Sequence, residues 1–211
     1  RVLFRPTGAA GVNVITDAID VDGTITTTGA GIVTLNANGL GATVGTVDIE
    51  AGADITSDGD VTITALNGIT TAGNVDTSSS NSNVTFASAT TLDAAIAITT
   101  GGAAGGNIAF GDTLDSDGVA ARDLTLTAGT GNITFTGAVG SGVGTELGAM
   151  LVNSAANVTA ASTVEATSFV QTAGTGTTQF AAAVTTTGAA GVNVVTDAID
   201  VDGTIDRKSV V

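Results

Sequence analysis

The 211-residue chain contains no cysteine, histidine, tryptophan or tyrosine. Without cysteine it forms no disulfide and offers no thiolate to a metal, so cysteine usage leaves the redox compartment undetermined. Without histidine it lacks the commonest general base and the commonest ligand of transition metals. A Ser-His-Asp triad in its usual form is therefore excluded.

Basic residues are also scarce, with 5 Lys and Arg against 20 Asp and Glu. Between residues 7 and 205, Arg122 is the only base against nineteen acids, a net charge of −18. Such a surface repels phosphate backbones and anionic lipid headgroups. No apolar run approaches the roughly eighteen residues that a membrane helix needs. We therefore expect no nucleic-acid partner and no direct membrane insertion.

One stretch of sequence occurs twice, once near each end of the chain. Residues 7–25 read TGAAGVNVITDAIDVDGTI, and residues 187–205 match them at eighteen of nineteen positions, Val195 replacing Ile15. A close match at long period indicates a tandem array. We interpret residues 7–205 as a repeat unit in which residues 186–205 begin the next copy of residues 6–25.

The two ends of the chain fit nothing else in it. Residues 1–6 (RVLFRP) and residues 206–211 (DRKSVV) both resemble translated sequencing adapters. We interpret both as adapter-derived artefacts and give them no part in the fold. A natural basic tail is the alternative.

Signals for helices are few, because glycine recurs every few residues and threonine and valine dominate. Short alternating runs bounded by Gly, Asn or Asp are typical of strands with one buried and one wet face. These runs cover residues 12–15, 32–35, 61–64, 83–86, 107–110, 124–127, 132–135, 157–160 and 177–180. Asn83, Asn132 and Asn157 each begin an N-x-T sequence, which matches a glycosylation acceptor. In this setting we interpret them as turn asparagines followed by strand threonines.

The spacing of the runs predicts how the strands are arranged. We take the equivalent apolar positions as Ile15, Leu35, Ile63, Phe86, Phe110, Phe135, Ala160, Phe180 and Val195. The intervals between them are uneven but average in the low twenties. Such a period predicts an all-β fold, a parallel β-helix (β-solenoid) with about eight coils per repeat unit. An all-β sandwich is the competitor, but so long a repeat with so many short strands fits it poorly.

Three D-x-D-G sequences place alternate carboxylates before a glycine, at residues 20–23, 115–118 and 200–203. Such carboxylates can converge on Ca²⁺, which takes six to eight oxygen ligands. The candidate metal ligands are Asp20, Asp22, Asp115, Asp117, Asp200 and Asp202. The full EF-hand pattern and the glycine-rich repeat of calcium-binding β-rolls are both absent. Weakly bound calcium is therefore the only cofactor suggested, and solvated turn acids are the alternative.

Several phrases resemble the β-strand repeat regions of giant bacterial surface proteins of the filamentous-haemagglutinin and autotransporter-passenger type. They are LTLTAGTGNITFTGAVG (124–140), NSAANVTAASTVEATSFVQTAGTGTTQF (153–180) and VTTTGAAGVNV (184–194). The resemblance extends over residues 7–205. It implies a right-handed β-helical stalk, secreted to the bacterial outer surface and used for adhesion or surface structure. The implied partners are glycans or proteins of host or neighbouring cells, together with neighbouring repeat units.

Two other classes of function remain open at this point. A dedicated glycan-binding module is one, and its first candidate contacts are the loops at residues 78–82, 101–106 and 140–148, since loops on rigid scaffolds carry binding variation. A β-helical carbohydrate-active enzyme is the other. Asp112 with Asp115 or Asp117 could supply two carboxylates for glycoside hydrolysis, but substrate-stacking Trp and Tyr are missing. We expect no enzyme. An excised unit has open strand edges, so we also expect end-to-end self-association.

Overall fold

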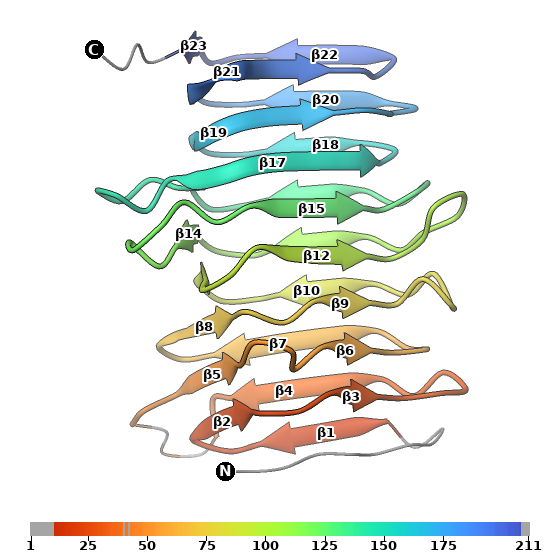
Figure 1. The fold of residues 1–211 in the computed structure, drawn as a ribbon. Coiled ribbons are helices and arrows are strands. Elements are labelled where there is room, and N and C mark those ends of the chain that lie inside the picture. Colours follow the sequence, from red (N-terminus) through yellow and green to blue (C-terminus); the bar gives the residue numbers. More distant parts are fainter. Residues whose placement is uncertain (1–10, 40, 42, 208–211) are drawn as a thin grey trace.

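The structure is a computed structural model that describes residues 11–39, 41 and 43–207. This part of the chain forms 23 strands and no helix. The strands wind around one axis, and each coil stacks on the one before (Figure 1). All of the strand pairs are parallel. The predicted parallel β-helix is confirmed, and its right hand stays a prediction.

Three sheets run along the axis. The first contains β1 (Val12–Ile15), β4 (Val33–Ala37), β7 (Val61–Ala65), β10 (Val84–Phe86), β13 (Ile108–Phe110), β16 (Ile133–Phe135), β18 (Val158–Ala160), β20 (Thr177–Phe180) and β22 (Ala198–Val201). The second contains β2 (Ala18–Val21), β5 (Thr46–Ile49), β8 (Gly68–Thr71), β11 (Thr90–Leu92) and β14 (Leu114–Ser116). The third contains β3 (Ile25–Thr26), β6 (Ile55–Thr56), β9 (Val75–Asp76), β12 (Ile96–Thr99), β15 (Leu124–Thr127), β17 (Leu147–Ser154), β19 (Val164–Gln171), β21 (Val184–Val194) and β23 (Ile205–Arg207).

The second sheet continues beyond β14 through single bridges. Leu114 pairs with Val139, and Val139 pairs with Val164 at the start of β19. The long strands β19 and β21 therefore cover both the second and the third side of their coils. Each of the nine predicted runs overlaps a strand: eight lie in the first sheet, and residues 124–127 form β15. The remaining strands were not singled out from the sequence.

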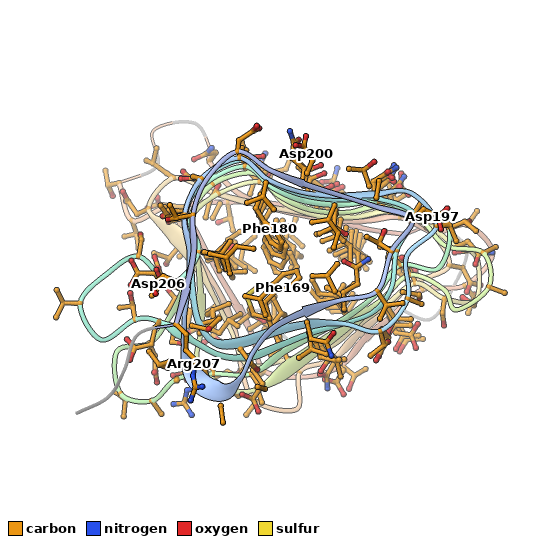
Figure 2. The ribbon with its side chains drawn as sticks, turned by 90° about the horizontal axis from the view of Figure 1, so that it is seen from above. Phe169, Phe180, Asp197, Asp200, Asp206 and Arg207 are labelled. Carbon is orange, nitrogen blue, oxygen red and sulfur yellow. The ribbon has the colours of Figure 1, made fainter. Side chains whose placement is uncertain are left out.

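The core is a set of columns in which equivalent side chains stack from coil to coil. Along the first sheet, one column contains Val14, Leu35, Ile63, Phe86, Phe110, Phe135, Ala160, Phe180 and Val201. The rings of Phe86 and Phe110 are stacked with centroids 5.3 Å apart. Phe169 points into the interior from the third sheet and meets Phe180 edge-on at 5.2 Å (Figure 2). All of these side chains except Val201 at the end of the stack are buried, which makes the columns one continuous apolar core.

Two members of the predicted column were wrong. Ile15 points outward and is 62% exposed, because side chains alternate along a strand and its neighbour Val14 takes the inward position. Val195 also lies outside the column, and Val201 occupies the position above Phe180. The interval from Phe180 to Val195 is therefore not a coil. Observed steps along this column are shortest from Ala160 to Phe180 and longest from Leu35 to Ile63.

A ladder of asparagines lies at the turn before the first sheet. The side-chain oxygen of Asn83 accepts the backbone N–H of Asn107 at 2.8 Å, and that of Asn107 accepts the N–H of Asn132 at 2.8 Å. Asp60 begins the ladder by accepting from Asn83, and Asn157 ends it by accepting from Thr177. The N-x-T asparagines thus occupy turns before strands, as interpreted from the sequence.

The chain ends interpreted as artefacts are only partly described. Residues 1–6 and 208–211 lie outside the described residues. Asp206 and Arg207 continue β23, which pairs with Thr185 and Thr186 of β21.

Candidate functional site

Acidic side chains gather along the outer side of the second sheet. Asp20 of β2 pairs in register with Asp48 of β5. Asp22 and Glu50 directly follow these two strands, and the N–H of Glu50 donates to the carbonyl of Val21. One carboxylate oxygen from each of Asp20, Asp22 and Glu50 lies within 4.8 Å of the other two. We call Asp20, Asp22 and Glu50 the carboxylate cluster.

The spacing within the carboxylate cluster suits a hard cation. Ca²⁺ binds oxygens at about 2.3–2.6 Å, so two ligands on opposite sides of one ion are about 5 Å apart. Three oxygens within 4.8 Å of each other therefore fit around a single ion. They supply at most half of the six to eight ligands that Ca²⁺ takes, so the geometry favours weak binding.

The electrostatics around the carboxylate cluster reflect crowded negative charge. The Asp48 side chain is exposed, but desolvation by the surrounding protein raises its pKa, and the charges of Asp20, Asp93 and Asp22 raise it further. Oδ1 of Asp20 is buried and has no hydrogen-bond partner. A cation here would relieve both the repulsion and the unsatisfied acceptor.

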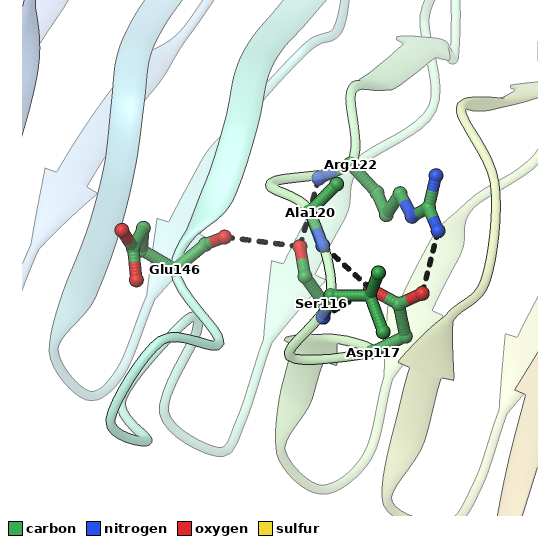
Figure 3. A network of polar contacts seen from close by, with 6 residues as sticks. Ser116, Asp117, Ala120, Arg122 and Glu146 are labelled. Carbon is green, nitrogen blue, oxygen red and sulfur yellow. Dashed lines mark hydrogen bonds and ion pairs between the residues drawn. The ribbon is translucent and has the colours of Figure 1, made fainter.

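Asp115 and Asp117 do not join the carboxylate cluster. Asp115 accepts hydrogen bonds from the N–H of Ser141 at 3.1 Å and from the hydroxyl of Thr145 at 3.3 Å. Asp117 forms an ion pair with Arg122 at 2.5 Å, and the hydrogen bond from Arg122 holds its pKa well below the usual range. These contacts fix the loops around β14, as Figure 3 shows for Asp117 and Arg122.

A serine links the same two loops from coil to coil. The hydroxyl of Ser116 accepts the N–H of Arg122 at 2.9 Å and donates to the carbonyl oxygen of Glu146 at 3.0 Å (Figure 3). Asp115, Asp117 and Ser116 thus hold the loops that follow β14 and precede β17. Their hydrogen-bonding groups are used within the fold, so they are poor candidates for a metal ligand set.

The second copy of the D-x-D-G sequence lies in a different sheet. Asp200 belongs to β22 in the first sheet and accepts a hydrogen bond from Gln179 at 3.1 Å. Asp200 and Asp202 are both exposed. Among the described residues, only the carboxylate cluster brings three such groups this close. The structure therefore unites Asp20 with Asp22 and separates them from the other four predicted ligands.

Glu50 is the ligand that sequence analysis missed. It lies a full coil after Asp22 along the chain and belongs to no D-x-D-G sequence. Its place beside Asp22 depends on the length of the coil between β2 and β5, which local sequence does not reveal. When the loops of a coil are long, the residues that lie side by side in successive coils cannot be inferred from the spacing of the strands in the sequence.

A hollow is lined in part by the loop at residues 140–148, one of the three loops predicted as candidate glycan contacts. Its volume is about 360 Å³, at the small end of ligand sites. The lining residues are Ser141, Gly142, Val143, Gly144, Glu146, Glu165, Ala166, Thr185 and Thr187. Two glutamates and several hydroxyl-bearing residues line it without a base, a donor set that suits a neutral polyol or a cation rather than an anion.

No family model, curated protein or solved structure matches the chain. Within the described ranges, no helix is long and apolar enough to cross a membrane.

Proposed function

We propose that the chain is a non-catalytic segment of a stiff, acidic stalk that belongs to a secreted bacterial surface protein. One observation carries this proposal: a single apolar column continues in register through the nine strands of the first sheet. A stack in which each coil contacts its neighbours over three sheets has no hinge along its axis. The resemblance to adhesin repeat regions supports the location on the outer surface.

The mechanism of such a stalk is mechanical. Stacked coils transmit force along the axis through backbone hydrogen bonds and the continuous core, and a longer array extends further from the cell. The charge of −18 between residues 7 and 205 keeps neighbouring stalks apart and opposes aggregation along their sides. Adhesive contacts to surface glycans or proteins would then come from loops or from a distal tip.

The test is the length of chains that contain one, two and four repeat units. At about 4.8 Å per coil, each unit of about eight coils should add roughly 38 Å to a straight particle. Small-angle scattering and electron microscopy measure this length directly. A length that saturates, or particles that bend at unit boundaries, would overturn the stalk.

A glycan-binding module is the second candidate, favoured by the hollow beneath residues 141–144. Saturable binding of one glycan, lost in Glu165→Gln and retained in the distant Glu50→Gln, would support it. Surface glycans of mixed composition, presented as an array, are the appropriate probe.

A carbohydrate-active enzyme fits the side chains less well. A general acid must hold a proton near its operating pH, whereas the Asp117 carboxylate stays ionised beside Arg122. The Asp115 carboxylate already accepts hydrogen bonds from Ser141 and Thr145. Turnover of any polysaccharide by the purified chain would contradict the non-catalytic assignment.

A further inference from the structure

The two copies of the duplicated stretch occupy different sheets. Val14 lies in the first sheet, whereas its counterpart Val194 pairs with Gln171 in the third. Ile19 lies in the second sheet, whereas Ile199 pairs with Thr178 in the first. Each segment of the second copy thus lies one sheet earlier in the winding than its counterpart.

The third segment follows the same rule. Ile25 lies in the third sheet beside Ile55. Its counterpart Ile205 begins β23 and pairs with Val184 at the start of β21. Although both strands belong to the third sheet, Val184 stacks on Val164, in the column that continues the second sheet from β14. The displacement is therefore the same for all three segments of the stretch that the structure describes in both copies.

Chain length explains this displacement. The segment from Phe180 to Val194 is shorter than the shortest coil on this column, which runs from Ala160 to Phe180. So short a segment cannot complete a coil with strands on three sides and the corners between them. The chain therefore brings Val194 only as far as the third sheet, and Val201 completes the coil above Phe180.

Local sequence does not oppose the displacement. In both copies the V-x-V and I-x-V patterns turn alternate apolar side chains inward, and every sheet accepts such a pair. The same stretch can therefore serve any side of the coil, and the length of chain between its copies decides which.

The second copy also forms an apolar end. Ile199, Val201 and Ile205 occupy inward columns but are 54%, 40% and 47% exposed, because no described coil lies above them. Their counterparts Ile19 and Ile25 are buried beneath the next coil. Figure 2 views the molecule along this axis, with Phe180 and Phe169 inside the ring and Asp200 outside it.

We propose that successive repeat units are related by a screw operation that turns each unit back by one sheet, about a third of a turn. The next unit covers the apolar end formed by Ile199, Val201 and Ile205. One unit then contains eight coils less one side of a coil, that is, about a third of a turn less than eight full turns. The fourth unit therefore repeats the orientation of the first. This inference rests on the tandem stalk proposed above.

The screw has a consequence for what the stalk displays. The carboxylate cluster faces outward from the second sheet, while Asp200 and Asp202, the counterparts of Asp20 and Asp22, lie on the first. Three consecutive units therefore present their acidic clusters and loops on three different sides. A stalk built this way meets partners from every direction, whereas units in one orientation would display them on a single side.

Engineered cysteine pairs test the register, since the chain has no cysteine of its own. The proposed register places the outward residues Gln179 and Asp200 side by side. An arrangement in which both copies share one orientation would instead place Asn193 beside Gln179. Neighbouring strands lie about 4.8 Å apart, within the range that a disulfide spans.

Three double variants are compared after mild oxidation: Gln179→Cys with Asp200→Cys, Gln179→Cys with Asn193→Cys, and the control Gln179→Cys with Thr159→Cys. The control pair is adjacent in both arrangements. Each is made in this chain and in a longer chain where residues 26–205 are repeated after Ile205. The longer chain tests the register with a further unit in place.

We expect the Asp200 pair and the control to form disulfides in both chains, and the Asn193 pair to remain reduced. Cross-linking through Asn193 in the longer chain overturns the screw, as does a control pair that forms while the Asp200 pair does not. Failure of the stalk itself is distinguishable. In that case the control pair still forms a disulfide, but small-angle scattering gives the longer chain the same particle length as this one.

Discussion

The rings of Phe110 and Phe135 lie 5.4 Å apart and within 4° of parallel, stacked from one coil to the next. Phe110 stacks in the same way on Phe86 below it. Each ring is buried, so each contributes both apolar burial and contact with the next coil. Phe86, Phe110 and Phe135 are among the largest fully buried side chains of the described chain.

Replacing Phe110 with Ala should therefore destabilise the protein strongly. The loss of a buried ring together with the cavity that remains costs about 3–5 kcal/mol in unfolding free energy. Urea denaturation followed by far-UV circular dichroism measures it. Val119→Ala, at an 85% exposed loop position, is the control and should change stability by less than about 0.5 kcal/mol. Equal effects of the two substitutions would contradict the packed column.

The asparagine ladder predicts a difference between two substitutions of Asn107. Its side-chain oxygen accepts from the backbone N–H of Asn132 at 2.8 Å and from Nδ2 of Asn132 at 3.2 Å. Asn107→Ala removes this acceptor and should cost about 1 kcal/mol. Asn107→Asp retains an acceptor, as Asp60 does for Asn83, and should retain most of the stability at neutral pH. If both variants lose the same stability, the side-chain oxygen is not the stabilising group.

The ion pair between Asp117 and Arg122 predicts a dependence on acid pH. The folded-state pKa of Asp117 lies below its ordinary value near 3.8. Its contribution to stability is therefore present above that value and is lost as the pH falls from it toward the folded pKa. Wild type should exceed Asp117→Asn in stability at pH 7, and the difference should shrink below about pH 4. A difference that stays constant across this range would contradict the assignment.

Asp48 should behave in the opposite sense. Its folded-state pKa is raised, by desolvation first and then by Asp20, Asp93 and Asp22. The resulting contribution is favourable below the unfolded pKa and is lost as the pH rises through the folded pKa. Asp48→Asn should therefore be more stable than wild type at pH 7, and the advantage should disappear toward pH 3. Thermal melts at several pH values, with exposed Asp112→Asn as the control, measure this.

The carboxylate cluster predicts a modest, site-specific response to calcium. Because only three carboxylates can reach the ion, we expect a dissociation constant for Ca²⁺ of about 10⁻⁴–10⁻³ M, as in the weaker protein sites. Millimolar CaCl₂ should raise the melting temperature of wild type above its value in chelator. The increase should be smaller in Glu50→Gln and unchanged in Asp202→Asn. Identical responses in all three proteins would indicate general charge screening instead of a site.

The apolar end predicts association that depends on concentration. Ile199, Val201 and Ile205 expose inward-facing side chains at a free strand edge, which favours contact with another edge. Sedimentation velocity should show larger species as concentration rises, and Ile199→Lys should suppress them. Ile15→Lys, at an exposed position on the outer surface, should not. A strictly monomeric wild type at high concentration would contradict this expectation.

Much of the fold was predictable because its signals are local. Inward and outward side chains alternate along each strand, so runs such as residues 83–86 and 132–135 were recognisable as half-buried strands, and they overlap β10 and β16. Their recurrence along the chain indicated stacking. The absence of histidine and cysteine limited any metal site to oxygen ligands. By contrast, the very short strands, such as β6 and β9, carry too little pattern to be found.

The candidate site was only half predictable. Asp20 and Asp22 are close in sequence and remain close in space, whereas Glu50 joins them only because the coil from Val21 to Ile49 closes directly above β2. The identical pair Asp200 and Asp202 gains no such partner among the described residues.

The sequence by itself determined that side chains alternate between the inside and the outside along each strand, because that alternation is a property of the extended backbone. In β1 only the structure showed that Val14, and not Ile15, turns inward. The sequence also determined the repeat, the acidic surface and the exclusion of histidine- and cysteine-dependent chemistry. Only the tertiary structure decided which sheet each strand enters. Val14 and Val194 lie in nearly identical sequences yet occupy the first and third sheets. The physical reason is chain length. A strand stacks on the strand of the preceding coil that it reaches, and the number of residues between the two decides which strand that is.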